Sequence, residues 1–159
     1  MTNSAIALLR ASLIAIFLGS LLAQTLILPL FIAESVSIHP EVAYLATPYR
    51  WVVTAGIICL QVALACIWIL LSKVQRQRIF ENSSLRWVTT IICASAIATF
   101  LVLGLGFHLL AIVGAGGPGV FLMVAGTVAF GSAATWLLVV MRNLLASAIG
   151  LEAEMRAVI

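Results

Sequence analysis

Charged residues are scarce in this sequence, and long stretches contain none. Only 8% of the 159 residues are charged, whereas ordinary globular domains are about 25% charged. The longest uncharged stretch, between Arg86 and Arg142, has 55 residues. So few lysines and arginines cannot form a surface that follows a phosphate backbone, which excludes a nucleic-acid-binding protein. The composition, 64% hydrophobic, indicates an integral membrane protein.

The sequence also lacks the patterns that bind metals or form disulfide frameworks. It has three cysteines, all in apolar runs and none in a C-x-x-C pair: Cys59, Cys66 and Cys93. We expect these to be small packing residues. The two histidines, His39 and His108, make only a weak metal site by themselves, although Glu34 or Glu41 could supply a third ligand. We therefore expect no metal and no cofactor, and an ordinary interfacial hydrogen bond for His108.

The sequence does contain four apolar runs that are long enough to cross a bilayer. A helical span needs about 20 apolar residues, and its backbone groups must be paired internally because lipid offers no partners. A glycine-rich turn at 114–119 divides the longest uncharged stretch into two spans. We therefore predict one transmembrane domain, an all-α integral membrane four-helix bundle, with spans at about 9–33, 50–73, 87–113 and 118–142.

The first run has a feature that is also typical of a signal peptide, because Arg10 precedes an apolar stretch. The apolar core of a signal peptide has about 7–15 residues and ends at a small-residue cleavage site. Here the apolar run continues to Ala33, well beyond that length. We therefore expect this segment to be a retained membrane span.

Basic residues are distributed unevenly around the four runs. Four of the eight lie in the connection 73–86, and three more, Arg10, Arg142 and Arg156, share its side once four spans are crossed. Only Arg50 lies on the other side. Because basic residues concentrate on the cytoplasmic face of membrane proteins, we predict that both termini are cytoplasmic.

The C-terminal tail, residues 143–159, has apolar residues at the three- and four-residue spacing of a helix face. Glu152 and Arg156 have the i,i+4 spacing of an ion pair on the opposite face. We predict a short amphipathic cytoplasmic helix that prolongs the fourth span, although Gly150 weakens it. This helix is expected to pack on the connection between spans two and three, on a partner or on the membrane surface.

The apolar runs contain amides, hydroxyls and one histidine but no acidic or basic residue. Four-span exporters that exchange protons depend on an embedded carboxylate, so its absence argues against that function. Gln24 and Gln61 lie at similar depth on successive antiparallel spans, and we predict that they hydrogen-bond and join the helices. A ligand or ion role for these amides is the alternative. His108 lies near the outer end of the third span.

Small residues recur on the fourth span at Ala125, Ala129 and Ala133. Such a stripe lets helix backbones approach closely. Packing within the bundle is our first interpretation, and association with a second copy is the alternative. The spans offer no nucleophile beside a base and a carboxylate, so we expect no enzymatic activity.

Three segments carry a resemblance to a known family. They are 24–30 (QTLILPL) in the first span, 61–63 (QVA) with Trp68 in the second, and 78–87 (RIFENSSLRW) at the start of the third. Together they resemble a bacterial domain-of-unknown-function family of small four-span membrane proteins. Members of that family are often encoded beside a Cro/CI-type helix-turn-helix regulator. The resemblance implies the fold and a bacterial inner-membrane location, but it implies no catalytic residue.

The segment before the third span has the features of a cytoplasmic turn. We expect Phe80 to lie at the membrane interface and Arg86 to meet lipid phosphates. The candidate lipid or partner contacts on this face are Arg76, Arg78, Phe80 and Arg86. A lipid-anchoring loop is the first interpretation, and a docking surface for a cytoplasmic partner is the alternative.

These observations favour a non-enzymatic membrane protein with a regulatory, sensory or accessory-subunit role, acting through helix packing and its basic cytoplasmic face. Its expected partners are the bilayer, a cytoplasmic regulatory protein, and a second copy or a larger membrane complex. The alternative is a small-molecule or ion transporter or channel, acting alone or as an oligomer. That alternative needs a polar path through Gln24, Gln61 and His108, so a bilayer-depth cavity lined by them would favour it.

Overall fold

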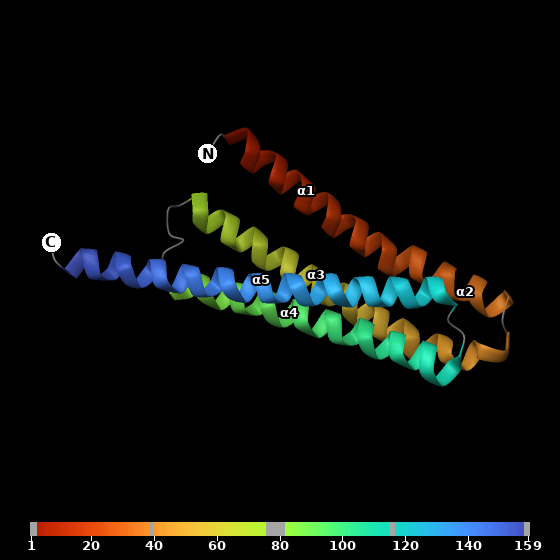
Figure 1. Ribbon diagram of the computed structural model, residues 1–159. Helices are drawn as coiled ribbons and strands as arrows, with labels where there is room; N and C mark the ends of the chain where they lie inside the picture. The colour runs from red at the N-terminus through yellow and green to blue at the C-terminus, as the bar shows by residue number, and fades with distance from the viewer. Residues whose placement is uncertain (1–2, 39, 76–81, 115–116, 158–159) are drawn as a thin grey trace.

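The computed structural model describes residues 3–38, 40–75, 82–114 and 117–157 (Figure 1). All the regular secondary structure in these residues is helical. Four segments are long and apolar enough to cross a membrane: Ile6–Ile38, Ala43–Gln75, Ser83–Val113 and Pro118–Leu151. The prediction of an all-α protein with four helices of membrane-spanning length is therefore confirmed.

These segments are longer than the sequence predicted. Each has 31 to 34 residues, which corresponds to about 46–51 Å at 1.5 Å per residue, whereas the hydrocarbon core is about 30 Å thick. The predicted spans end near charged residues, but the helices continue past Arg10, Arg50 and Arg142. A charge limits the apolar part of a helix and not its backbone hydrogen bonding, so the helices extend beyond the core or tilt.

A π-helical turn interrupts the first span. The span consists of helix α1 (Asn3–Leu22), the π-helical turn η1 (Ala23–Ile27) and helix α2 (Leu28–Ile38). The Leu28 N–H donates to the Ala23 carbonyl, five residues earlier. Pro29 has no N–H, and its ring excludes the carbonyl four residues before it. The π-turn accommodates this proline, and it does so at the position of Gln24 and Thr25.

Short connections separate the remaining helices. A 3₁₀ turn η2 (Pro40–Leu45) leads into α3 (Ala46–Gln75), and α4 (Asn82–Phe107) continues as the π-helical turn η3 (His108–Val113). Gly114 then ends this span in the left-handed region with φ +66°, a conformation that favours glycine. Helix α5 (Pro118–Ala157) begins four residues later. The predicted break between the last two spans is confirmed at Gly114, whereas Pro118 and Gly119 belong to α5 and residues 115–116 lie outside the described residues.

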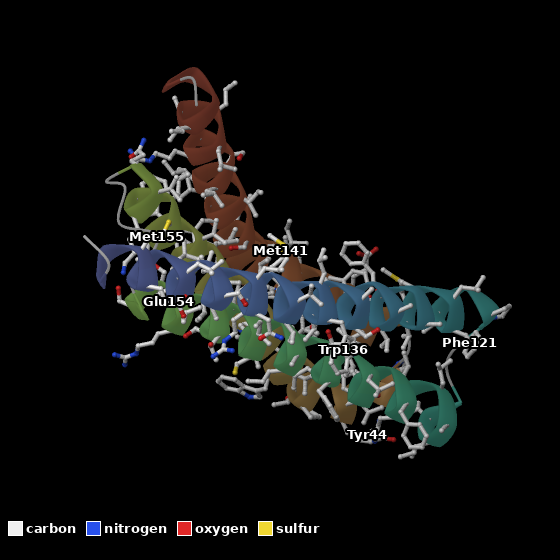
Figure 2. All side chains as sticks on the ribbon, turned by 60° about the vertical axis from the view of Figure 1, so that its left-hand side comes forward. Tyr44, Phe121, Trp136, Met141, Glu154 and Met155 are labelled. Atoms are coloured by element: carbon white, nitrogen blue, oxygen red, sulfur yellow. The ribbon has the colours of Figure 1, made fainter. Side chains whose placement is uncertain are left out.

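The helices pack mainly in chain order, as a row (Figure 1). Both α1 and α2 pack on α3, α3 packs on α4, and α4 packs on α5. Figure 2 shows α1 standing away from α5. Within the described residues α5 packs extensively on α4 alone, so the helices do not close into the four-helix bundle that the sequence suggested. Hydropathy does not distinguish a row from a closed bundle, because both expose apolar faces to lipid.

The two ends of this row differ in charge. The first turn of α1 and the last turn of α5 lie at the same end as the end of α3 and the start of α4 (Figure 1). We call this the basic end. Its described basic residues are Arg10, Lys73, Arg86 and Arg142. The opposite end, which we call the glycine-turn end, holds η2 and Gly114, and Arg50 lies near it in the second turn of α3.

Helix α5 continues without a break from the last span into the C-terminal tail. It passes through Gly150 and ends at Ala157. The tail is therefore an extension of α5 and not a separate short helix. The side chains of the predicted pair Glu152 and Arg156 lie outside the described residues.

Small residues set the contact between α4 and α5. A Cβ at Gly131 would overlap the Thr99 hydroxyl, and one at Gly106 would overlap Val124. The hydroxyls of Ser95 and Thr135 are 2.9 Å apart and form a hydrogen bond across the same interface. Close approach and polar contacts of this kind are the usual source of helix association in membranes.

Candidate functional site

A polar cleft lies between α3 and the first span, and none of its lining residues belongs to α4 or α5. Its volume is about 840 Å³. The side chains that line it come from α1, η1, α2 and α3: Leu21, Gln24, Thr25, Ile32, Ala46, Thr47, Arg50, Trp51, Thr54 and Gln61. On α3 the polar members are spaced three, four or seven residues apart, so they share one helix face. The π-turn places Gln24 and Thr25 opposite that face.

The inner part of the cleft holds an amide network. Gln61 Nε2 donates to Gln24 Oε1 over 3.2 Å and to Ser20 Oγ over 3.3 Å. All three side chains are buried or half-buried. The structure thus brings together the two glutamines that the sequence paired. Hydrogen bonds of this kind join membrane helices at about 0.6–2 kcal/mol each.

Two of the three threonines that line the cleft differ from the other helical threonines in the described chain. Six helical threonines donate to the carbonyl of the residue four positions earlier, namely Thr25, Thr89, Thr90, Thr99, Thr127 and Thr135. Thr47 and Thr54 make no such bond, and both line the cleft. Thr54 lies well inside α3, where a preceding helical carbonyl is within reach. Its half-buried hydroxyl is therefore available to a molecule in the cleft.

Arg50 and Trp51 form the mouth of the cleft at the glycine-turn end. Both side chains are exposed, and the Arg50 guanidinium has no hydrogen-bond or ion-pair partner within the part of the chain that the structure describes. Glu34 on α2, also exposed, forms no ion pair with it. An unpaired guanidinium beside an interfacial tryptophan favours an anionic group at this level of the membrane.

His108 does not belong to this cleft. Its Nδ1 is 2.9 Å from the Tyr49 hydroxyl, and the two rings meet edge to face at 5.8 Å. Tyr49 also lines a separate cavity of about 390 Å³ between α2, α3 and the last turns of the third span, whose other lining residues are almost all apolar. The structure therefore does not place His108 in the cleft that Gln24 and Gln61 line.

His108 and His39 are the two histidines that could share a metal ion. His39 lies outside the described residues. Among the residues that are described, no group of three histidine, cysteine or acidic side chains is placed to hold a metal ion. The Tyr49 hydroxyl accounts for the hydrogen bonding of His108 Nδ1.

At the basic end, three basic side chains each reach a neighbouring helix. Arg10 on α1 donates to Gln75 Oε1 on α3 and stacks over the Trp68 ring at 5.3 Å. Lys73 on α3 donates to Ser83 on α4. On α5, Arg142 Nε donates to Thr89 Oγ1 on α4 over 2.8 Å. The contacts α1–α3, α3–α4 and α4–α5 thus each have a basic cross-link at this end.

The candidate docking residues are only partly described. Arg76, Arg78 and Phe80 lie outside the described residues. Arg86 is in the second turn of α4 and is exposed. Its exposure distinguishes it from Arg10 and Arg142, whose guanidinium groups are bonded inside the row.

The alanine stripe lies beside the α4 contact and not in its centre. Ala125, Ala129 and Ala133 are all exposed, and the first two line the edge of a groove between α4 and α5. The face that packs on α4 carries Gly131 and Thr135 instead. Packing within the bundle and association with a second copy both stay predictions for this stripe. Figure 2 shows Phe121, Trp136 and Met141 along the same helix, and each is exposed.

Sequence reasoning identified the glutamines of the cleft but not Arg50 or Thr47. Arg50 was expected only as a loop charge on the less basic side. The sequence does contain a pattern that indicates its role: Thr47, Arg50, Trp51, Thr54 and Gln61 have the spacing of one helix face. This pattern can be recognised only once the helix is known to begin before Arg50.

Comparisons with known proteins give one finding. A family model described as "Protein of unknown function (DUF2975)" matches residues 30–159. This range includes two of the three resembling segments, whereas 24–30 lies almost wholly outside it. No curated protein and no solved structure matches the chain.

Proposed function

Since the chain belongs to the DUF2975 family of proteins of unknown function, we propose its role from the site and the charge pattern. The chain is a non-enzymatic protein of the bacterial inner, or cytoplasmic, membrane, and it acts as a regulator, sensor or accessory subunit. The absence of enzymatic activity is proposed from the sequence, because the apolar runs carry no acidic or basic side chain.

The proposed orientation puts the basic end in the cytoplasm. Seven of the eight basic residues belong to the segments at that end, and only Arg50 belongs to the other. The positive-inside rule then favours cytoplasmic termini. The common location of both described chain ends (Figure 1) is consistent with an even number of crossings.

The observation that carries the proposed role is the use of basic side chains at this end. Arg10, Lys73 and Arg142 cross-link the row, so their heads are engaged within the protein. Arg86 remains exposed on the same end. A basic end whose helices are cross-linked and whose Arg86 is exposed is suited to hold a cytoplasmic partner at the membrane surface. The resemblance to proteins encoded beside a helix-turn-helix regulator supports a regulatory partner.

A mild-detergent pull-down with mass spectrometry tests this role. Tagged wild-type protein is compared with a triple variant, Arg76→Gln, Arg78→Gln and Arg86→Gln, and with Arg50→Gln as the matched control at the other end. We expect one set of copurifying proteins in the wild type and the control, and its loss in the triple variant. Recovery of nothing above background, or of the same proteins with all three chains, contradicts the proposed role.

A second candidate function is transport, which the polar cleft favours. Single cysteines at Gln24, Thr54 and Gln61, in a chain whose three native cysteines are alanine, are labelled by charged thiol reagents from each side of the membrane. Labelling of the inner positions from both sides would support a transport pathway. Labelling from one side alone would make the cleft a binding site and exclude a continuous path.

A further inference from the structure

We propose that the polar cleft binds an anionic glycerophospholipid taken from the leaflet at the glycine-turn end. This inference goes beyond the proposed regulatory role, because it concerns the opposite end of the molecule and needs no cytoplasmic partner. It rests on charge, on an unsatisfied hydroxyl and on the polarity of the α1–α3 interface along its length.

Charge identifies the headgroup. The Arg50 guanidinium lies at the mouth of the cleft without a partner in the described chain. A guanidinium presents several N–H donors in a planar fork that matches two oxygens of a phosphate. Trp51, beside it, has the amphipathic ring that is enriched at the headgroup level. The pair therefore fits an anionic phosphate at the interface.

The hydroxyl of Thr54 fits the next part of the ligand. Thr54 is one turn deeper than Arg50, about 6 Å along the helix axis. It is the interior threonine of α3 whose hydroxyl makes no bond to the preceding turn. A hydroxyl at this depth can donate to an ester carbonyl of the glycerol backbone, which lies just below the phosphate in a bilayer. A free inorganic anion would leave Thr54 without a partner.

Beyond the glutamines the same interface becomes apolar. A second groove of about 330 Å³ follows the cleft along α1 and α3. Its lining residues are Leu13, Ile14, Phe17, Leu18, Leu64, Ala65 and Trp68. Ala65 lies eleven residues beyond Thr54, about 16 Å, which is close to half of the ~30 Å hydrocarbon core. The interface thus changes from cationic to polar to apolar in the order of a phospholipid's own parts.

The amides between the two grooves do not oppose an acyl chain. Gln61 Nε2 donates to Gln24 Oε1 and to Ser20 Oγ. These two bonds meet part of the hydrogen-bonding need of the junction within the protein, so it makes a smaller demand for a polar ligand than Arg50 and Thr54 do. We therefore assign the acyl chain to this part of the interface.

Quenching of Trp51 fluorescence by brominated lipids tests the proposal. The chain used carries Trp51 as its single tryptophan, with Trp68, Trp87 and Trp136 replaced by phenylalanine, and is placed in nanodiscs. Brominated phosphatidylglycerol is compared with brominated phosphatidylcholine at equal mole fractions. We expect an apparent preference of about fivefold for the anionic lipid, as one interfacial basic residue provides.

Variants in the same background locate the site. Arg50→Gln is expected to abolish the preference, so that the two lipids quench equally, and Arg50→Lys is expected to retain part of it. Thr54→Val is expected to weaken quenching by both lipids, since both carry the ester group. Arg86→Gln, the matched control at the basic end, is expected to keep the full preference. Circular dichroism and gel filtration establish that each variant is folded.

Four results would overturn the proposal. Equal quenching by both lipids in the unsubstituted cleft would remove the headgroup specificity. Equal loss in Arg50→Gln and Arg86→Gln would reduce it to general surface charge. A response of Trp51 to millimolar inorganic phosphate in phosphatidylcholine nanodiscs, without lipid preference, would make it a free-anion site. Efficient cross-linking of Thr54→Cys between two chains would make the cleft a contact between copies.

Discussion

Arg142 on α5 and Thr89 on α4 are joined by a hydrogen bond of 2.8 Å from Nε to Oγ1, 53 residues apart in the sequence. Thr89 in turn donates to the carbonyl of Leu85 in its own helix. The threonine hydroxyl therefore connects the last helix to the start of α4. The basic residue that ends the long uncharged run thus has a structural role as well as a topological one.

Replacement of Thr89 by valine is expected to destabilise the protein by about 0.6–1.7 kcal/mol, the range measured for hydrogen bonds between membrane helices. Valine has nearly the same shape but cannot accept the Arg142 bond. Thr90→Val is the matched control, because Thr90 is exposed and bonds only within α4. The free energy of unfolding in mixed detergent micelles is the measurement. Equal losses in the two variants would mean that the interhelical bond adds nothing.

Gly131→Val is expected to destabilise the α4–α5 contact by about 1–3 kcal/mol, as overpacking does. Its Cβ would overlap the Thr99 hydroxyl. Gly126→Val serves as the control, since a Cβ at Gly126 meets nothing within 4 Å. The same unfolding measurement applies. As a further check, Thr99→Ala is expected to relieve most of the cost of Gly131→Ala, and failure of that rescue would place the clash elsewhere.

Gln24 and Gln61 are expected to be energetically coupled. In a double-mutant cycle with leucine at each position, the interaction free energy is expected at about 0.6–1.7 kcal/mol, because either single change removes the 3.2 Å bond. Gln61→Leu combined with Thr127→Val, whose hydroxyl bonds only within α5, is expected to be additive within about 0.5 kcal/mol. Additivity of the two glutamine changes would contradict the network.

Tyr49→Phe is expected to lower the melting temperature in detergent, because it removes the bond to His108 that joins α3 to the end of the third span. The expected cost is about 0.6–1.7 kcal/mol. Tyr44→Phe is the matched control: Tyr44 is 73% exposed and is labelled at the glycine-turn end in Figure 2. Its effect is expected within about 0.5 kcal/mol. A larger loss in Tyr44→Phe than in Tyr49→Phe would contradict the assignment.

Part of the candidate site was predictable from the sequence. Gln24 and Gln61 were paired from their depth on successive antiparallel spans, and the structure joins them. The assignment worked because depth depends only on the rise per residue and the positions of the run ends. Arg50 was missed because its charge marked the end of a run, whereas the helix begins at Ala46 and includes it.

The alanine stripe shows why helix faces are harder to predict than helix positions. Ala125, Ala129 and Ala133 have a regular spacing, but the contact with α4 uses the face of Gly131 and Thr135. Neighbouring residues on a helix are rotated by about 100°. Because α5 carries small and apolar residues on more than one face, composition does not select one of these faces for protein and another for lipid.

The sequence by itself determined that this is an all-helical protein with four segments able to span a membrane, and that seven of its eight basic residues belong to the segments at one end. Those properties follow from hydropathy and from the need to pair backbone groups within each helix, both of which act locally along the chain. Only the tertiary structure decided that the helices form an open row, that basic side chains cross-link it, and that a polar cleft lies between the first span and α3. These features depend on contacts between residues far apart in the sequence, and a hydropathy pattern carries no information about which distant surfaces meet.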